Sequence, residues 1–269
     1  MDKFYVITNQ TKDEKYEVTK AIKKYIEENG KRCILEGEQP IPNDTEGVLV
    51  IGGDGTLIQA ARELLDKKMQ LIGINLGTLG YLTEIEMQAV YPALDKLFAD
   101  EYTVEERMML RGRLPNGKED VALNDIIVTR YGSLRLISFR VYVNGELLNT
   151  YQADGMIIST PTGSTAYNLS AGGPVVEPTA SLIVLTPICS HALNTSSIIL
   201  SVEDEIIIEM GSRRGNEVEE AVVAFDGTDV LKVRTGDRIR VKKADETMKL
   251  MKINQVSFLE TLRRKMKGN

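Results

Sequence analysis

The sequence predicts an α/β N-terminal domain with a mostly parallel sheet, followed by an all-β domain. Strand-like and helix-like segments alternate over the first ~100 residues, glycine-broken β-type runs follow, and a helical pattern returns at the end. Alternating strands and helices give a parallel sheet, because parallel strands need crossover connections. We expect an α/β domain over residues 1–100, joined by 248–269, and a β domain over 101–247.

The first half of the chain contains three apolar runs and three amphipathic patterns. Buried strands are predicted over 3–9, 48–51 and 71–75. Thr11 and Glu14 have the spacing of a capping box, so we expect the first helix to begin there and to end before Gly30. The predicted helical faces are Val18, Ile22, Tyr25 and Ile26, then Leu57, Ala61, Leu64 and Leu65, then Val90, Leu94, Leu97 and Phe98.

The second half has the two-residue period of β-strands. Apolar and polar residues alternate from Phe139 to Val143, and Asn144-Gly145 then favours a tight hairpin turn. Further short runs lie at 206–208 and 222–225. The last segment, 256–267, has a helical pattern, and we expect this helix to pack on the first domain.

Composition excludes several classes of protein. The 269 residues are 42% apolar, which is enough for real cores, and the net charge of −6 argues against a general nucleic-acid binder. Cys33 and Cys189 are far apart and lack CxxC spacing, so we expect no disulfide framework, no zinc site and a cytoplasmic location. Neither an export signal nor a long apolar run is present, so we expect no membrane span.

The run Gly52-Gly53-Asp54-Gly55-Thr56 lies between a predicted strand and a predicted helix. Glycines let a ligand approach the backbone, and the free amides at a helix N-terminus attract phosphate. The alternative is a tight turn in which Asp54 and Thr56 cap the helix. No lysine stands in the run and the chain has no GxxxxGK followed by Ser or Thr, which argues against a P-loop.

A second glycine-rich turn, Gly77 to Gly80, follows the next predicted strand. Ligands of open α/β sheets lie beyond the carboxyl ends of the strands, so we expect the two loops to border one crevice. Asp54 would face the ligand there, and a carboxylate can accept the proton of a hydroxyl group. The pattern therefore indicates phosphoryl transfer to an alcohol, with Mg²⁺ brought by a nucleotide.

The stretch from Asp154 to Pro174 is a predicted strand followed by a loop rich in Ser, Thr and Gly. Its hydroxyl groups and amides can bind the base and ribose of a nucleotide, and Tyr167 offers an aromatic face. Taken alone, such a segment is also typical of a surface turn, and Asp154-Gly155 and Asp226-Gly227 favour turns in the same way.

Four blocks resemble the signatures of the bacterial NAD kinase family, in the same order: GGDGT, LGTLGYLTE, NDIIV and DGMIISTPTGSTAYNLSAGGPVVEP. The resemblance implies an α/β N-terminal domain, a C-terminal β-sandwich, a cleft between them, and homo-oligomers, commonly tetramers, that share residues between subunits. It also implies transfer of the terminal phosphoryl group of ATP, or of polyphosphate, to the adenosine ribose 2′-hydroxyl of NAD, with Mg²⁺ carried by the nucleotide rather than by a dedicated protein site.

The resemblance further assigns roles to individual residues. Asp54 matches the base that takes the proton from the ribose hydroxyl, and Asp125 stands where many members have glutamate. The implied NAD and nucleotide contacts are Gly53, Gly55, Thr56, Asn124, Asp125, Asp154, Thr162, Thr165, Ala166, Tyr167, Ser170 and Asp226.

Two other functions remain as alternatives. GGDGT also resembles lipid kinases, but the long Ser/Thr/Gly block and the lack of a basic amphipathic helix favour a soluble dinucleotide. A non-catalytic dinucleotide sensor could keep the same pocket, although binding alone would not require the carboxylate of Asp54.

The residues that bind the phosphate donor are not located by the sequence. Short basic runs are more typical of solvated faces, and His191 is interpreted as structural, in a segment that lacks the Arg-Pro that often follows in the family. The basic candidates are Arg111, Arg113, Arg213, Arg214, Arg263, Arg264, Lys265 and Lys267.

Overall fold

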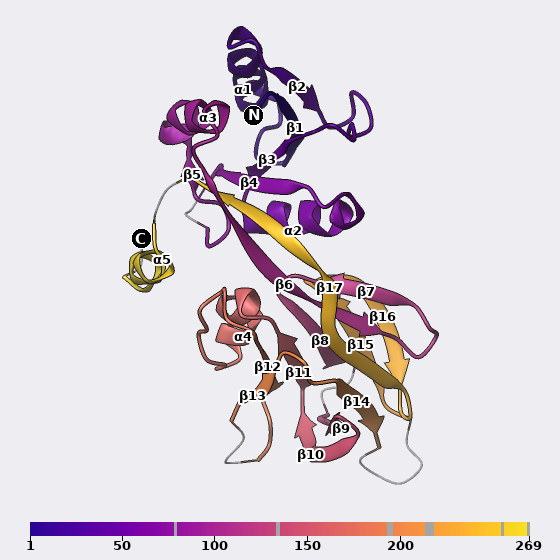
Figure 1. The fold of residues 1–269 in the computed structure, drawn as a ribbon. Coiled ribbons are helices and arrows are strands. Elements are labelled where there is room, and N and C mark those ends of the chain that lie inside the picture. The colour runs from indigo at the N-terminus through magenta and orange to yellow at the C-terminus, as the bar shows by residue number, and fades with distance from the viewer. Residues whose placement is uncertain (78–79, 133–134, 193–195, 213–217, 254–255, 268–269) are drawn as a thin grey trace. The chain divides into compact units, whose positions relative to one another are not determined.

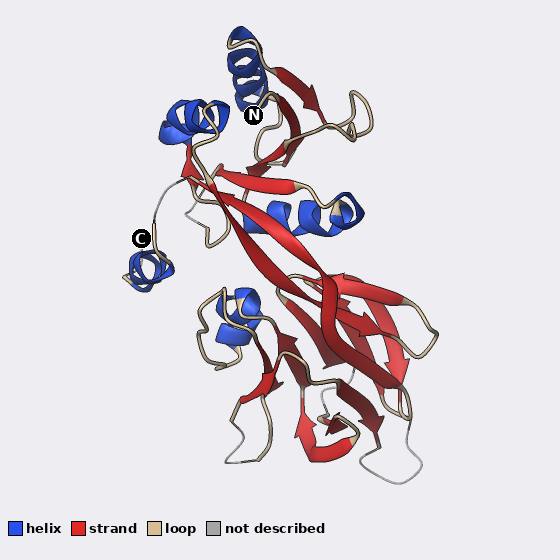
Figure 2. Ribbon diagram, in the orientation of Figure 1, coloured by secondary structure: helices blue, strands red, loops and turns tan. Residues whose placement is uncertain are grey.

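The computed structural model describes residues 1–77, 80–132, 135–192, 196–212, 218–253 and 256–267 (Figure 1). The chain forms two compact units, Met1–Glu106 with Thr247–Asn269, and Arg107–Glu246. The longer helices belong to the first unit, whereas strands make up most of the second (Figure 2). The predicted fold class, α/β followed by all-β with a C-terminal helix, is confirmed.

The first unit is a parallel sheet in the order β4-β3-β1-β2. The short strand β5 and the end of β17 both pair with β4, again in parallel. The elements of this unit are β1 (Lys3–Thr8), α1 (Glu17–Glu28), β2 (Arg32–Leu35), β3 (Gly47–Gly52), α2 (Asp54–Glu63), η1 (Leu65–Lys67), β4 (Gln70–Asn75), β5 (Ile85–Glu86), η2 (Met87–Ala89), α3 (Val90–Phe98) and α5 (Phe258–Met266).

Helices cover both faces of this sheet. One apolar core joins α1 and α3 to alternate sheet residues such as Phe4, Leu49 and Ile72. The other face receives α2, whose Leu57 lies so close to Gly73 that a Cβ there would stand 2.8 Å from its Cδ1 atom. The sheet is therefore buried on both sides, as expected for parallel strands.

Two antiparallel sets of strands form the second unit. One is β13-β12-β11-β8-β15-β16, and the other is β10-β9-β14-β17. Their inward residues, such as Val128, Phe139 and Ile208, share one apolar core, which makes this unit a β-sandwich. The elements that lie wholly or partly in this unit are β6 (Thr103–Arg113), β7 (Glu119–Ala122), β8 (Asp125–Arg130), β9 (Ile137–Val143), β10 (Glu146–Ala153), β11 (Gly155–Ser159), η3 (Thr162–Thr165), α4 (Tyr167–Ser170), β12 (Leu182–Ile188), β13 (Ile198–Ser201), β14 (Ile206–Gly211), β15 (Glu220–Phe225), β16 (Thr228–Arg234) and β17 (Arg238–Lys252).

Local turn chemistry is predicted well in one place and wrongly in another. Asn144 and Gly145 both have positive φ and join β9 to β10, as the hairpin prediction requires. The capping box at Thr11 is wrong, because α1 begins only at Glu17. Asp13 caps the helix from outside, where its carboxylate accepts hydrogen bonds from the amides of residues 18 and 19.

Candidate active site

Asp54 is the first residue of α2, directly beyond the carboxyl end of β3. Its Oδ1 atom accepts hydrogen bonds from the amides of Leu82 (3.1 Å) and Thr83 (3.0 Å) and from the Thr83 hydroxyl (2.9 Å). Its Oδ2 atom accepts one, from the amide of Tyr81, at 2.7 Å. Four donors therefore fix the orientation of this carboxylate, and Oδ2 keeps more free acceptor capacity than Oδ1.

Glycine is required where the two loops meet. A Cβ on Gly80 would stand 2.0 Å from Oδ1 of Asp54, and one on Gly52 would stand 2.5 Å from Oγ1 of Thr56. At Gly55 the corresponding space is open. The two glycine loops therefore meet at Asp54, as the sequence predicted; residues 78 and 79 of the second loop lie outside the described part of the chain.

A lysine that the sequence analysis did not identify lies over the first loop. A Cβ on Gly53 would stand 3.1 Å from the Nζ atom of Lys12, and one on Gly77 would stand 3.5 Å from it. Lys12 comes from the loop after β1, in which the side chain of Asn9 accepts from the amide and hydroxyl of Thr11 and donates to Thr56. A cationic side chain thus stands beside the GGDGT loop even though none is near it in the sequence.

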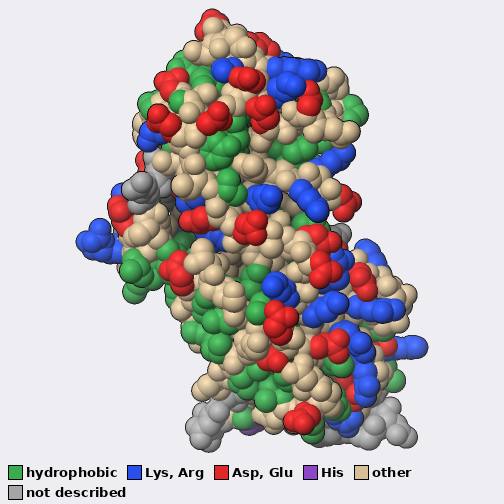
Figure 3. All heavy atoms as spheres, viewed as in Figure 1, with side chains coloured by type: hydrophobic (Ala, Val, Ile, Leu, Met, Phe, Trp, Pro, Cys, Tyr) green, Lys and Arg blue, Asp and Glu red, His purple; other side chains and the backbone are tan. Residues whose placement is uncertain are grey.

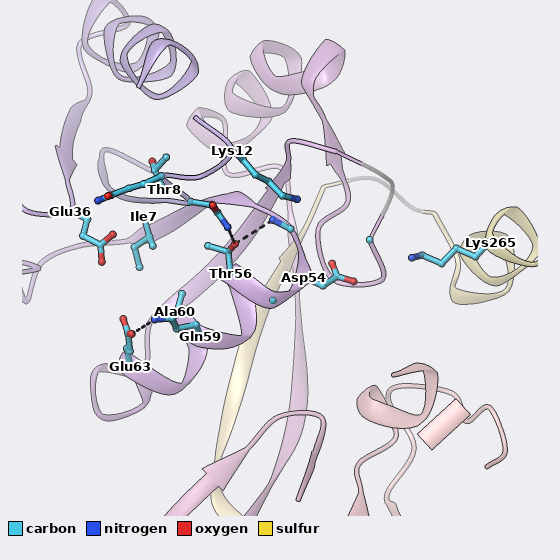
Figure 4. Close-up of a pocket in the computed structure, with 15 residues that line it drawn as sticks. Ile7, Thr8, Lys12, Glu36, Asp54, Thr56, Gln59, Ala60, Glu63 and Lys265 are labelled. Atoms are coloured by element: carbon cyan, nitrogen blue, oxygen red, sulfur yellow. Dashed lines mark hydrogen bonds between the residues drawn. The ribbon is translucent and has the colours of Figure 1, made fainter. Parts of the chain in front are cut away.

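These residues border a pocket of about 660 Å³ in the first unit (Figure 4). Asp54, Lys12 and Lys265 lie toward one end of it, and Glu36 and Glu63 toward the other. Burial, together with the charge of Glu63, raises the pKa of Glu36. The N-terminus of the ten-residue helix α2 opens onto the pocket, which adds partial positive charge at the end that holds Lys12.

A second group of predicted site residues comes together in the β-sandwich unit. The carboxylate of Asp226 accepts hydrogen bonds from the amides of Leu123, Asn124 and Asp125, at 2.8, 2.7 and 3.2 Å. Asp226 itself has a φ of 50°, in the turn between β15 and β16. Asp226 therefore holds in place the segment that carries Asn124 and Asp125.

The Ser/Thr/Gly loop packs against the same segment. The amide of Thr160 donates to the carbonyl of Asn124 at 2.8 Å, and a Cβ on Gly163 would stand 2.1 Å from that carbonyl oxygen. Within the described residues, nothing hydrogen-bonds the buried hydroxyl of Thr162. A buried hydroxyl without a partner costs free energy, so Thr162 is a natural contact for a ligand or for water.

The remaining predicted residues of this loop are more accessible. Thr165 and Ala166 are half-buried, whereas Tyr167 and Ser170 on α4 are exposed. Tyr167 is 44% exposed, so an aromatic side chain is accessible to a ligand.

The surroundings of Asp125 perturb its carboxyl group strongly. It is buried, and desolvation together with the nearby charge of Asp226 raises its pKa to about 7. This side chain can therefore carry a proton near neutral pH and donate a hydrogen bond, which an ordinary ionised aspartate cannot do.

Asp154 does not join this group. It precedes β11, whereas Ser159 at the other end of β11 pairs with Asp125, so the two ends are on the order of 15 Å apart. The carboxylate of Asp154 accepts a 2.7 Å hydrogen bond from Nε of Arg130. Within one chain, therefore, the predicted contact set is divided between the two ends of a strand.

The other basic candidates have ordinary surroundings. Arg111 pairs with Glu246 and Arg264 with Glu260, while Arg213 and Arg214 lie outside the described residues. Acidic and basic side chains are interspersed on the face shown in Figure 3, which fits solvated charges. Lys265 is the one basic candidate from the sequence that lines the pocket beside Asp54 in the described part of the chain.

Some other predictions concern groups away from the pocket. His191 is exposed, and the residues directly after Ala192 lie outside the described part. Burial raises the pKa of Cys33 to about 12, and Cys189 is exposed; neither forms a disulfide. Among the described helices, none is long and apolar enough to cross a membrane.

Family models match both parts of the chain. Residues 2–102 match the ATP-NAD kinase N-terminal domain, and residues 123–253 match the ATP-NAD kinase C-terminal domain. The chain belongs to the ATP-NAD kinase family. The resemblance seen in the sequence is therefore confirmed.

Relatives and solved structures in the ATP-NAD kinase family cover nearly the whole chain. The NAD kinase of Lachnospira eligens is 45% identical over 295 residues (99% of this chain and 100% of the relative), and that of Agathobacter rectalis 46% over 282 residues (100% and 99%). A yeast NADH kinase complexed with NADH gives a TM-score of 0.89 at 21% identity, covering 100% of this chain and 88% of that one. An Archaeoglobus fulgidus NAD kinase in complex with ATP gives a TM-score of 0.81 at 24% identity, covering 98% of this chain and 98% of that one. These two structures support the fold.

Proposed function

We propose that this protein is an NAD kinase that transfers the terminal phosphoryl group of ATP to the adenosine ribose 2′-hydroxyl of NAD, giving NADP and ADP. One observation carries the proposal beyond family membership. The carboxylate of Asp54 is oriented by four donors at the mouth of a pocket that also holds Lys12 and a helix N-terminus. A fixed proton acceptor beside a phosphate-binding surface is the arrangement that phosphoryl transfer to an alcohol needs.

The pocket in the first unit suits the donor. Lys12 and the first turn of α2 attract the triphosphate, and open space at Gly55 lets it approach the backbone. Mg²⁺ is commonly held largely by the phosphates of its substrate and by water, which leaves the carboxylate of Asp54 at that end of the pocket to act as the base. We therefore expect Mg²⁺ to arrive with ATP and to neutralise charge on the triphosphate.

The acceptor is assigned to the polar loops of the second unit. Asn124, Asp125 and the hydroxyl of Thr162 supply polar contacts, and Tyr167 supplies an aromatic face for a ring of the dinucleotide. Thr165, Ala166 and Ser170 flank that face on the same loop and helix. Gly53 and Thr56 belong to the phosphate-binding loop of the first unit.

The chemical step needs no covalent intermediate with the protein. The proton of the 2′-hydroxyl passes to Oδ2 of Asp54, the ribose oxygen forms a bond to the terminal phosphorus, and the bond from that phosphorus to the bridging oxygen breaks. The proton-accepting atom is Oδ2, because Oδ1 already accepts three hydrogen bonds. ADP leaves with the electron pair of the broken bond.

The assay that tests this function mixes purified protein with NAD, ATP and Mg²⁺ and detects NADP with a dehydrogenase that accepts only NADP. Asp54→Asn is expected to lower the rate by ~100- to 10,000-fold while NAD binding persists. Parallel reactions with polyphosphate and with NADH define the donor and the acceptor. A folded wild-type protein that makes no NADP from any of these pairs would favour a dinucleotide sensor instead.

We also propose that the protein acts as a cytoplasmic homo-oligomer, and a tetramer is the form that the family resemblance implies. The position of Asp154, far along β11 from Asn124, supports an arrangement in which Asp154 contacts the dinucleotide of a neighbouring subunit.

A further inference from the structure

The loop that orients Asp54 continues directly into a nearly buried ion pair. Glu84 follows Thr83, and its side chain is only 9% exposed. One of its carboxylate oxygens, Oε1, accepts a 2.7 Å hydrogen bond from the amide of Ile253. The other, Oε2, pairs with Nζ of Lys252, whose side chain is 14% exposed.

A buried ion pair is weak evidence of net stabilisation. Removing two charges from water costs several kcal/mol for each ion, and apolar residues of similar volume are often no less stable. What such a pair does provide is a defined geometry, since each charge must meet the other. Here that geometry ties the residue after Thr83 to the end of a sheet strand, because β17 pairs with β4 at Lys249 and Leu250.

The C-terminal helix contacts the loop at a second point. Nζ of Lys265 on α5 lies 4.5 Å from the ring centroid of Tyr81, and the rings of Tyr81 and Phe258 have centroids 6.3 Å apart. The amide of Tyr81 is the donor to Oδ2 of Asp54. Residues 81–84 are therefore held by α2 through Asp54, and by the end of β17 and α5 through their own side chains.

We propose that Glu84 and Lys252 are positioning residues for Asp54. Their ion pair fixes the backbone of residues 81–83, and those amides in turn fix the carboxylate in the orientation that accepts the ribose proton. The catalytic consequence rests on the proposed function, whereas the effect on the loop does not depend on it.

The test compares Lys252→Met, Lys252→Arg and Glu84→Gln with wild type. Hydrogen exchange of the peptide that contains residues 81–83 is expected to be at least ~10-fold faster in Lys252→Met, because Glu84 loses its cation and the loop is then held less firmly to the strand end. The kcat for NADP formation should fall by ~10-fold or more while the Kd for NAD stays within about twofold. Lys252→Arg keeps the charge, so its exchange rate and its kcat should stay near those of wild type. Glu84→Gln keeps an acceptor for the amide of Ile253, so both of its values should lie between those of wild type and Lys252→Met.

Ile26→Val is the matched control, because Ile26 is fully buried in the core beneath α1 and lies outside the loop. It should lower the Tm without changing loop exchange or kcat. If Lys252→Met behaves like Ile26→Val, the pair serves stability alone and the proposal fails. If Lys252→Met does not fold, the double variant Glu84→Gln with Lys252→Met, which leaves no unpaired charge, takes its place. If wild type makes no NADP, the proposed function fails, and the exchange rates still decide the positioning role.

Discussion

The two oxygens of Asp54 have unequal surroundings, and this inequality suits a base. Oδ1 is occupied by three donors and Oδ2 by one, so rotation of the carboxylate would break hydrogen bonds. A base that is already oriented loses little freedom when the substrate binds. The arrangement requires glycine at position 80, where any side chain would collide with Oδ1.

Lys12 is expected to bind the donor phosphates. Lys12→Met should raise the KM for ATP by about 10- to 100-fold, the equivalent of a charged hydrogen bond of about 1.5–3 kcal/mol, with little change in the Kd for NAD. Steady-state kinetics at saturating NAD measures this. Lys24→Met is the control, since Lys24 lies on α1 and is 74% exposed. Equal KM values in the two variants would remove Lys12 from the donor site.

Asp125 is expected to make the stability of the protein depend on pH. Burial and Asp226 raise its pKa to about 7 in the folded protein, from an ordinary value of 3.8, so the folded state binds the proton more tightly. The protonated Asp125 therefore contributes fully to the free energy of unfolding below about pH 4. This contribution falls by up to about 1.4 kcal/mol for each pH unit as the pH rises to about 7.

Urea unfolding from pH 5 to 8 checks this dependence. Asp125→Asn, which cannot ionise, should flatten the decline over that range and be more stable than wild type at pH 8. Parallel pH curves for the two proteins would show that Asp125 does not titrate in this window.

At the scale of single elements, periodicity predicts the strands and helices, but side-chain hydrogen bonds decide how the loops run. The three predicted strands and the helices of the first half are present, whereas the four-residue strand β2 is too short to show a period and escapes prediction. The loop that carries Lys12 is shaped by Asn9 and Asp13, whose side chains bind nearby amides. An Asn directly after a buried strand is the available signal for this turn.

The junction of the two glycine loops should tolerate no side chain. Gly80→Ala is expected to destabilise the protein by about 1–3 kcal/mol, the usual cost of overpacking, because its Cβ would overlap Asp54. Gly55→Ala is the control within α2, where the space is open and alanine favours the helix. Denaturant unfolding measures both. Equal stability of the two variants would mean that the loop can move away from Asp54.

For the whole molecule, the sequence predicts two architectures but not the contacts that join distant segments. The blocks around Asp54 and Thr162 are recognisable because each is contiguous. The contact between Glu84 and the end of β17 cannot be recognised in the sequence, because Glu84 and Ile253 are 169 residues apart. The separation of Asp154 from Asn124 likewise depends on the register of β11 and β8.

Mixed oligomers test whether Asp154 serves a neighbouring subunit. Asp54→Asn and Asp154→Asn are expected to be impaired alone, but a co-expressed mixture should exceed the activity expected from the two proteins measured separately. The gain arises because a site with Asp54 from one chain and Asp154 from the other is complete. If the mixture is no more active than the two proteins measured separately, Asp154 contributes to the site of its own subunit.

The first unit is discontinuous in the sequence, and this affects how it can form during synthesis. The ribosome makes Arg107–Glu246, the whole second unit, before it makes residues 247–253. Until then, β4 lacks its partner in β17, and Glu84 lacks its cation. The β-sandwich can therefore fold while the chain is still growing, but the loop that orients Asp54 acquires its final support only afterwards.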